Sequence, residues 1–276
     1  MNEGWYAGLA ADDQDAHAAA ITEGSAESPA EWPDLAVTEG FVDDTEQYYD
    51  RLRAATIQAT RTAVRAAERS DDQQLIHAVR AMDDCEREAN ELAERVAEWG
   101  GSRYDETGTG IEYARELASR DAETPTDKRL VALAERVTDL AGEATRLREY
   151  VERTTPQVAP NLSALAGSVL AARLIALAGG LESLAKKPSG TVQVLGAEDA
   201  LFAHLQGNAP SPKHGVIYTH EYVRGTAQEQ RGSAARALAG KLSIAARVDH
   251  YSGEQRPELE AELDDRIERI RARDSA

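Results

Sequence analysis

Apolar residues recur at helical spacing over most of the chain beyond Thr45. The spacing predicts a helix over residues 45–70 whose apolar face contains Leu52, Ala55 and Ala59. It predicts a second helix from residue 71 whose apolar face contains Leu75, Val79 and Met82. The pair Gly100-Gly101 is typical of a helix end, so the second helix is predicted to stop there. The pattern predicts a mainly α-helical protein.

The first 45 residues lack this periodicity. Short apolar runs at Trp5–Leu9 and Leu35–Val37 are interrupted by glycines and by Pro33. Runs of this length between turn residues predict strands. We therefore expect a small, irregular α/β region at the start of the chain.

The most regular repeat lies in a helix predicted at about residues 126–154, and Pro156 and Pro160 are expected to end that helix. Apolar residues at seven-residue spacing, each followed by another three residues later, are the a and d positions of a coiled coil. A helix buried within one domain would show the same stripe over four turns, so both interpretations stay open. The coiled-coil core would consist of Leu130, Leu133, Val137, Leu140, Ala144, Leu147 and Val151.

These patterns divide the chain into five segments. They are an N-terminal α/β region (1–45), a helical segment (46–101), a coiled-coil segment (102–158), a compact all-helical module (159–253) and a charged C-terminal helix (254–276). A loop over residues 102–110 and a short helix at about 111–122 precede the coiled-coil helix. The last helix is so highly charged that it is expected to be solvated or frayed at its end.

The composition indicates the salt concentration and the cellular compartment in which the protein works. The formal net charge is −18, and only five of the 31 basic residues are lysine. A surface rich in acidic residues and poor in lysine is what we expect of a cytosol at molar salt. Cys85 is the single cysteine, no apolar run reaches the ~18 residues of a spanning helix, and the N-terminus lacks the basic start of a secretory signal. A cytoplasmic protein without a membrane segment is expected.

The charge is distributed unevenly along the chain. Residues 1–50 contain thirteen acidic residues and no Lys or Arg. Residues 159–253 contain nine basic and six acidic residues, although the rest of the chain is strongly acidic. A segment that stays positive against this background is expected to bind an anion, and RNA is the first candidate.

The compact module resembles a known family along its length. The segments that carry the resemblance are APNLSALAG (159–167), ARLIALAGGL (172–181), LAKKPS (184–189), VQVLGAE (192–198), PKHGVIY (212–218), RGSAAR (231–236) with Lys241, and AARVD (245–249). Weaker likeness extends to IHAVRAMDD (76–84) and ERVAEWG (94–100). In this order and spacing they resemble the Nop-domain core proteins of archaeal box C/D small ribonucleoproteins.

The resemblance implies a non-catalytic scaffold. Family members hold fibrillarin, the methyltransferase, through the N-terminal domain and pair two copies through the coiled coil. Their Nop domain binds a kink-turn in the box C/D guide RNA together with a small ribosomal-protein-like kink-turn protein, and the particle directs 2′-O-methylation of RNA. The segment between Gly101 and Ala159 is shorter than is usual in the family, so the resemblance implies self-association less directly than it implies RNA binding.

Candidate RNA- and partner-binding residues come from the basic module. On a helix, Arg236 and Arg247 would lie only about 20° apart and share a face, whereas Lys241 would lie about 140° from Arg236. By the resemblance, Lys186 and His214 lie near the joint between RNA and protein, and Gly196, Ala197 and Glu198 begin a helix at that surface. The full set is Lys186, Gly196, Ala197, Glu198, Lys213, His214, Arg231, Arg236, Lys241 and Arg247.

Three other functions could be inferred from parts of the sequence. A metal site built from His204, His214, His220 and His250 with Glu198 and Glu221 lacks the one-face spacing of a metallohydrolase, so no catalytic residue, metal or cofactor is predicted. A coiled-coil dimerisation protein without RNA binding would explain the heptads but not the basic module. A splicing-factor relative with the same domain is possible by likeness, and the short acidic chain favours the archaeal branch.

Overall fold

The computed structural model describes residues 4–10, 12–25 and 28–272, which divide into two compact units at the boundary between Ser70 and Asp71. The described residues contain fourteen α-helices and one 3-10 helix, and they contain no strand. The prediction of a mainly helical protein is confirmed. The terminal residues of the last predicted helix, 273–276, lie outside the described part of the chain.

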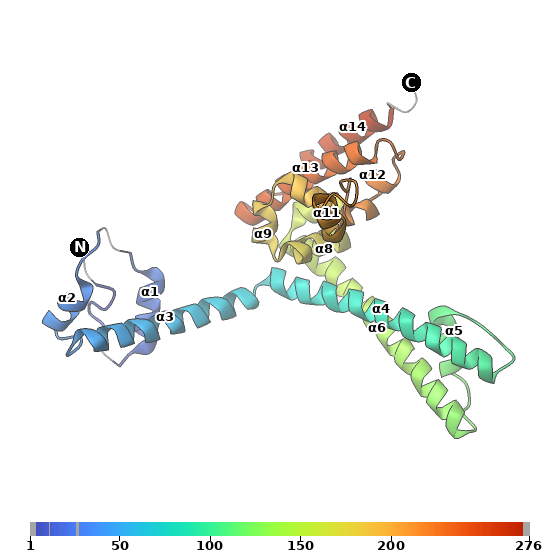
Figure 1. Ribbon diagram of the computed structural model, residues 1–276, viewed down its shortest axis with the longest axis horizontal. Coiled ribbons are helices and arrows are strands. Elements are labelled where there is room, and N and C mark those ends of the chain that lie inside the picture. Colours follow the sequence, from blue (N-terminus) through green and yellow to red (C-terminus); the bar gives the residue numbers. More distant parts are fainter. Residues whose placement is uncertain (1–3, 11, 26–27, 273–276) are drawn as a thin grey trace. The chain divides into compact units, whose positions relative to one another are not determined.

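The first unit contains α1 (Gln14–Glu23), α2 (Trp32–Thr38) and α3 (Thr45–Glu68) (Figure 1). Its core is largely aromatic: Tyr6 stacks on Phe41 with ring centroids 4.9 Å apart, and the indole of Trp5 donates a hydrogen bond to the Tyr48 hydroxyl at 3.2 Å. Buried His17 completes the cluster by hydrogen bonding to the Ala10 carbonyl at 2.9 Å. Aromatic side chains bury a large area per residue, which lets this short segment form a core.

The strands predicted in this unit were wrong. Residues 5–8 form turns, and Leu35–Val37 lies within α2. Pro33 stands in the first turn of α2, where proline's fixed φ favours a helix start and its missing N–H costs no hydrogen bond. A three-residue apolar run does not distinguish a strand from part of a helix by periodicity.

The second unit begins with a helical hairpin made of α4 (Asp71–Arg103) and α6 (Pro125–Val158), with α5 (Gly110–Ala118) packed at its tip (Figure 1). Thr124 and Asp127 form a capping box at the start of α6. The guanidinium of Arg103 donates to Asp127 at 2.8 Å, and this hydrogen bond is the main cause that holds the pKa of the Asp127 carboxyl far below its usual range. The two ends of the hairpin tip are therefore fixed together.

The heptad residues of α6 pack against α4 of the same chain. Leu130, Val137 and Val151 are fully buried. Leu133 and Leu147 are half-buried against the two cores of this unit, and Leu140 and Ala144 also keep partial exposure. Helices α4 and α6 therefore form a coiled-coil-like pair within one chain. The d positions Leu133, Leu140 and Leu147 remain partly accessible.

Three helix boundaries differ from the prediction. The helix α4 continues through Gly100-Gly101 to Arg103, α5 ends at Ala118, and α6 continues through Pro156 to Val158. Pro156 lies in the last turn, where it removes only one backbone hydrogen bond. Gly100 is buried where α4 meets α5. The two helices are so close that a Cβ at this position would stand 2.7 Å from the Tyr113 hydroxyl oxygen and 2.9 Å from Cδ1 of Leu117.

The neighbouring glycines of α4 should respond in opposite directions to alanine. Gly101→Ala is expected to stabilise the protein by about 0.5–1 kcal/mol, since alanine is the better helix former and its Cβ would meet only Thr107 at an ordinary 3.6 Å. Gly100→Ala is expected to destabilise it by about 1–2 kcal/mol, because the overpacking at Tyr113 and Leu117 outweighs the same propensity gain. Denaturant unfolding of both variants measures the difference, and equal stabilities would contradict the close helix crossing.

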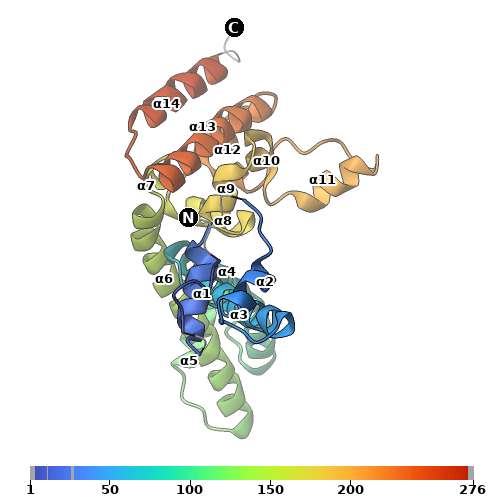
Figure 2. The same cartoon turned by 90° about the vertical axis from the view of Figure 1, so that its left-hand side faces the viewer.

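The rest of the second unit is built around α13 (Arg231–Tyr251) (Figures 1 and 2). Its alanine- and leucine-rich face is fully buried, with Ala234, Leu238, Leu242 and Ala245 at 0–1% exposure. The elements that complete this unit are α7 (Pro160–Ala166), α8 (Ser168–Ala178), α9 (Leu181–Lys186), α10 (Ser189–Val194), α11 (Glu198–Leu205), η1 (Val216–Thr219), α12 (Glu221–Arg224) and α14 (Glu258–Arg271). By length and composition no single helix in the described ranges passes as a membrane span, although α7 and α8, bent by 117°, pass together.

The helix α14 is not the solvated helix that its charge predicted. Leu259, Leu263, Ile267 and Ile270 are all buried against the core. These residues recur every three or four positions, which is the spacing of one helical face. The charged residues between them occupy the other face, so a highly charged sequence still packs along its described length.

Candidate nucleic-acid interface

Two loops of the second unit lie side by side at the start of α11. The backbone N–H of Gly215 donates to the Gln193 carbonyl at 2.9 Å, and that of Val216 donates to the Leu195 carbonyl at 2.7 Å. The Gln193 side chain donates to the Lys213 carbonyl at 2.7 Å. Lys213 and His214 are therefore held next to the segment that starts α11.

The start of α11 has the conformation that its sequence requires. Gly196 has a φ of 79°, in the left-handed region that favours glycine, and its N–H donates to the Glu198 carboxylate at 2.8 Å. Ala197 precedes the helix and Glu198 is its first residue. The predicted helix start at Gly196, Ala197 and Glu198 is confirmed.

A stack of planar side chains stands beside this loop pair. The His214 ring lies on the Tyr218 ring with centroids 4.6 Å apart and planes tilted by 26°, and the Arg231 guanidinium lies 5.5 Å from the Tyr218 centroid. Arg231 is held in place because its Nε donates to the Thr226 carbonyl at 3.0 Å. Burial, with help from the Arg231 charge, lowers the pKa of His214, which favours the neutral ring. Neutral, half-exposed rings of this kind are surfaces on which nucleobases stack.

The helix α11 itself has no buried residue. Phe202 is 64% exposed and Leu205 is 74% exposed. Figure 2 shows α11 standing out from the helices around α13. Two large apolar side chains exposed on one projecting helix make it a candidate contact surface for another molecule.

The predicted basic residues on α13 and α9 differ in availability. Arg236 is exposed and has no hydrogen bond or ion pair among the described residues. Arg247 is also exposed, but its guanidinium donates to the carbonyls of Ala185 at 3.1 Å and Lys187 at 3.4 Å. Lys241 pairs with Glu262 of α14, and Lys186 pairs with Glu182 one turn earlier on α9. Lys241 and Lys186 are thus partly neutralised; the i,i+4 spacing of Glu182 and Lys186 is visible in the sequence, whereas the pairing of Lys241 with Glu262 is not.

The positive charge of residues 159–253 is only partly compensated. Arg173 pairs with Asp83 of α4, and Arg224 lies 4.0 Å from Glu221. Within the part of the chain that the structure describes, five of the nine basic residues have no carboxylate within 4.0 Å, namely Lys187, Lys213, Arg231, Arg236 and Arg247. These five cations are called the free cation set below. An uncompensated set in so acidic a chain favours phosphate as its ligand.

The histidines considered for a metal site do not converge. His204 bonds the Ala209 carbonyl at 2.9 Å, and buried His220 bonds the Leu165 carbonyl at 3.1 Å. No group of three or more metal-ligating side chains is placed to hold an ion in the described ranges. The His204 and His220 rings are used instead in local hydrogen bonds, and the His214 and His250 rings contact Tyr218 and Tyr251.

Tyr218, Phe202, Leu205 and Arg266 were not predicted as site residues. Phe202 and Leu205 read as core residues in a sequence, because only the fold shows that nothing covers them. Tyr218 joins the site through its stacking on His214, four residues earlier in the chain. Arg266 lies on α14, outside the basic module, and only the packing of α14 brings it next to α13.

Comparison with known proteins identifies the family. Residues 41–271 match the Nop family model, described as "snoRNA binding domain, fibrillarin". The chain is 34% identical over 269 residues to an uncharacterised NOP5 family protein of Methanocaldococcus jannaschii, which covers 84% of this chain. The chain belongs to the Nop family. It is also 33% identical over 233 residues to nucleolar protein 58 of Schizosaccharomyces pombe, which covers 71% of this chain.

The fold agrees with this membership. A chain in the crystal structure of a fibrillarin/Nop5p complex has a TM-score of 0.54 and 23% sequence identity, with 92% of each chain covered. The matches span 65% of the Methanocaldococcus protein and 46% of the Schizosaccharomyces protein, so this chain covers less than two thirds of either relative. The shared part is the Nop-family region and the helical fold.

Proposed function

We propose that the chain is the non-catalytic scaffold of an archaeal box C/D ribonucleoprotein in the cytoplasm. It binds kink-turn RNA together with a kink-turn protein and recruits fibrillarin for guided 2′-O-methylation. The observation that carries this proposal is one surface of the second unit. There the loop pair around Gly196 and His214 joins the projecting apolar helix α11 to Lys213 and Arg231 of the free cation set.

The two parts of this surface suit two kinds of partner. Phe202 and Leu205 would lose most of their exposed area beneath a protein, and buried aromatic anchors supply much of the energy of protein interfaces. Lys213, Arg231 and Arg236 would contact phosphates, and the His214–Tyr218 stack offers a planar ring to an unpaired base. A kink-turn RNA with its bound protein would contact both the apolar part and the basic part of this surface.

Two further partners, fibrillarin and a second copy of the chain, involve other parts of the molecule. The first unit, with its strongly acidic sequence, would hold fibrillarin, and the family description and the likeness to the fibrillarin/Nop5p fold support this role. A second copy would pair along the hairpin, where an open groove of about 170 Å³ is lined by Ala141, Ala144 and Ile111 together with the charged Glu86, Arg115 and Arg148. The sedimentation mass of the purified protein reports whether that pairing occurs.

A gel shift tests the RNA function directly. The protein is titrated onto a box C/D kink-turn RNA with and without its kink-turn protein, at about 2–3 M salt, where exposed charges are screened within ~3 Å. A supershift is expected only when the kink-turn protein is present. Charge reversal of Arg236 and Arg247 together is expected to weaken this complex at least ~100-fold, because two charge-assisted hydrogen bonds to phosphate, each contributing about 1.5 kcal/mol or more, are lost.

A matched variant separates a local contact from total charge. Arg129 and Arg153 are exposed arginines of α6, far along the chain from the free cation set. Reversing both changes the net charge equally and should leave the supershift intact. Unchanged RNA affinity after reversal of Arg236 and Arg247 would refute the proposed surface. A folded wild-type chain that never shifts the RNA would favour a coiled-coil interaction protein instead.

A further inference from the structure

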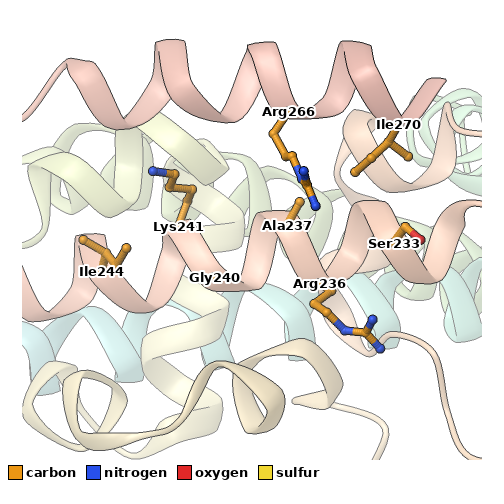
Figure 3. A pocket seen from close by; sticks show the side chains of 8 residues that line it. All are labelled: Ser233, Arg236, Ala237, Gly240, Lys241, Ile244, Arg266 and Ile270. Atoms are coloured by element: carbon orange, nitrogen blue, oxygen red, sulfur yellow. The ribbon is translucent and has the colours of Figure 1, made fainter. Parts of the chain in front are cut away.

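A groove of about 500 Å³ runs between α13 and α14, outside the loop pair described above. Figure 3 shows Ala237 and Gly240 of α13 in it, with Arg236 on one side and Arg266, from α14, on the other. A Cβ added at Gly240 would meet no atom within 4 Å, so the space above this part of α13 is open. From Arg236 to Ile244 the groove extends about 12 Å along the helix, which is longer than one phosphate group.

The charged residues of the groove leave an excess of positive charge. Lys241 is neutralised by Glu262, with 20% of its side chain exposed. Arg236 and Arg266 are both exposed and have no carboxylate partner among the described residues. The groove therefore presents two uncompensated guanidinium groups on opposite rims.

Arg266 differs from the other two arginines of α14. Arg269 donates to the Asp265 carbonyl at 2.9 Å, and Arg271 donates to the Glu221 carbonyl at 3.1 Å and the Thr226 hydroxyl at 3.2 Å. Arg266 makes no such hydrogen bond in the described structure and extends toward α13 (Figure 3). Although α14 is an acidic helix, it thus directs the unpaired guanidinium of Arg266 into the groove.

We propose that the α13/α14 groove binds the phosphate backbone of an RNA segment that continues beyond the loop pair, with Arg236 and Arg266 contacting it from opposite rims. The inference rests on the proposed function and extends its RNA path onto α14. Arg236 already belongs to the free cation set, so the groove is continuous with that surface. An acidic peptide fits less well, because Ile244 at 38% exposure is the one large apolar side chain that the groove exposes, Ile270 being buried.

The test compares Arg266→Ala with Arg269→Ala in the full-length chain. Fluorescence anisotropy gives the affinity for a kink-turn RNA with long flanking stems, in the presence of the kink-turn protein, over the salt range in which circular dichroism shows the chain folded. Arg266→Ala is expected to weaken binding ~3- to 10-fold and to reduce the slope of log affinity against log salt by about 0.7–0.9, the value for one lost phosphate contact. Arg269→Ala should match the wild type, and Arg266→Lys should recover the slope.

A tethered probe locates the RNA independently of affinity. An iron chelate attached through Ile244→Cys, in a Cys85→Ser background, is expected to cleave the RNA backbone at one short segment, whereas the same chelate at Arg269→Cys should not. Wild-type affinity and slope for Arg266→Ala, or equal losses for Arg266→Ala and Arg269→Ala, would overturn the groove while leaving the proposed function intact. Binding of a poly-glutamate peptide that blocks cleavage from Ile244→Cys without releasing the RNA would overturn it too. A wild-type chain that binds no RNA would refute the proposed function first.

Discussion

Replacing Asp249 with alanine is expected to lower the free energy of unfolding by roughly 4 kcal/mol. Asp249 is buried near the end of α13 and serves as the acceptor for the start of α7. Its carboxylate accepts from the backbone N–H of Asn161 at 3.0 Å and of Leu162 at 2.8 Å, and from the Asn161 side chain at 2.6 Å. Alanine would leave these donors buried without an acceptor and remove a negative charge from a helix N-terminus.

A surface carboxylate gives the matched control. Asp83 pairs with Arg173 and is 39% exposed, so Asp83→Ala is expected to cost no more than about 1 kcal/mol. Asp249→Asn keeps the shape and one acceptor oxygen, and it should lie between the alanine variant and the wild type. Chemical denaturation followed by circular dichroism measures all three. Equal costs for Asp249→Ala and Asp83→Ala would show that the buried hydrogen bonds at α7 contribute little.

Asp249 also shows where sequence reasoning reaches its limit. The module over residues 159–253 was predicted to be helical, and Pro160 was expected to end the helix before it, because both signals lie in neighbouring residues. The hydrogen bonds from residues 161 and 162 to residue 249 span almost ninety positions, and no local pattern contains them. The helices of the second unit were therefore predictable, whereas the contacts that fix their arrangement were not.

In the candidate site, too, local features were predictable and tertiary contacts were not. The family resemblance placed Gly196 and Glu198 at a helix start, and the structure agrees. Lys241 could be placed on a different face from Arg236, but its partner Glu262 lies on a helix that was expected to be solvated. The charge of Lys241 is visible in the sequence, but its neutralisation depends on tertiary packing.

In the aromatic first unit the error was local: a short segment was assigned the wrong secondary structure. Its segments are too short for periodicity to separate helix from strand, so Leu35–Val37 was interpreted as a strand although it is helical. The useful signal was Pro33 directly after Trp32, since proline in a first turn favours a helix. Local capping chemistry is more informative than hydrophobicity in runs of this length.

Gly215→Ala is expected to abolish the RNA–protein complex and to destabilise the chain by about 3 kcal/mol. A Cβ at Gly215 would stand 1.9 Å from the Leu195 carbonyl oxygen and 2.7 Å from the carbonyl carbons of Val194 and Leu195. These are backbone atoms, so no side-chain rotation relieves the overlap. The loop that carries Lys213 and His214 must then move away from the start of α11, and the hydrogen bonds that join the two segments are lost.

Gly190→Ala separates this effect from a general loss of glycine flexibility. Gly190 lies in α10, which leads into the segment that this loop pairs with, and a Cβ there would meet no atom within 4 Å. That variant should be at least as stable as the wild type and should bind RNA normally, because alanine favours the helix. Binding is compared at a temperature at which circular dichroism shows every variant folded. A Gly215→Ala chain that is folded and binds RNA with wild-type affinity would mean that Lys213 and His214 need not lie beside α11, and the interface would have to be placed elsewhere on the second unit.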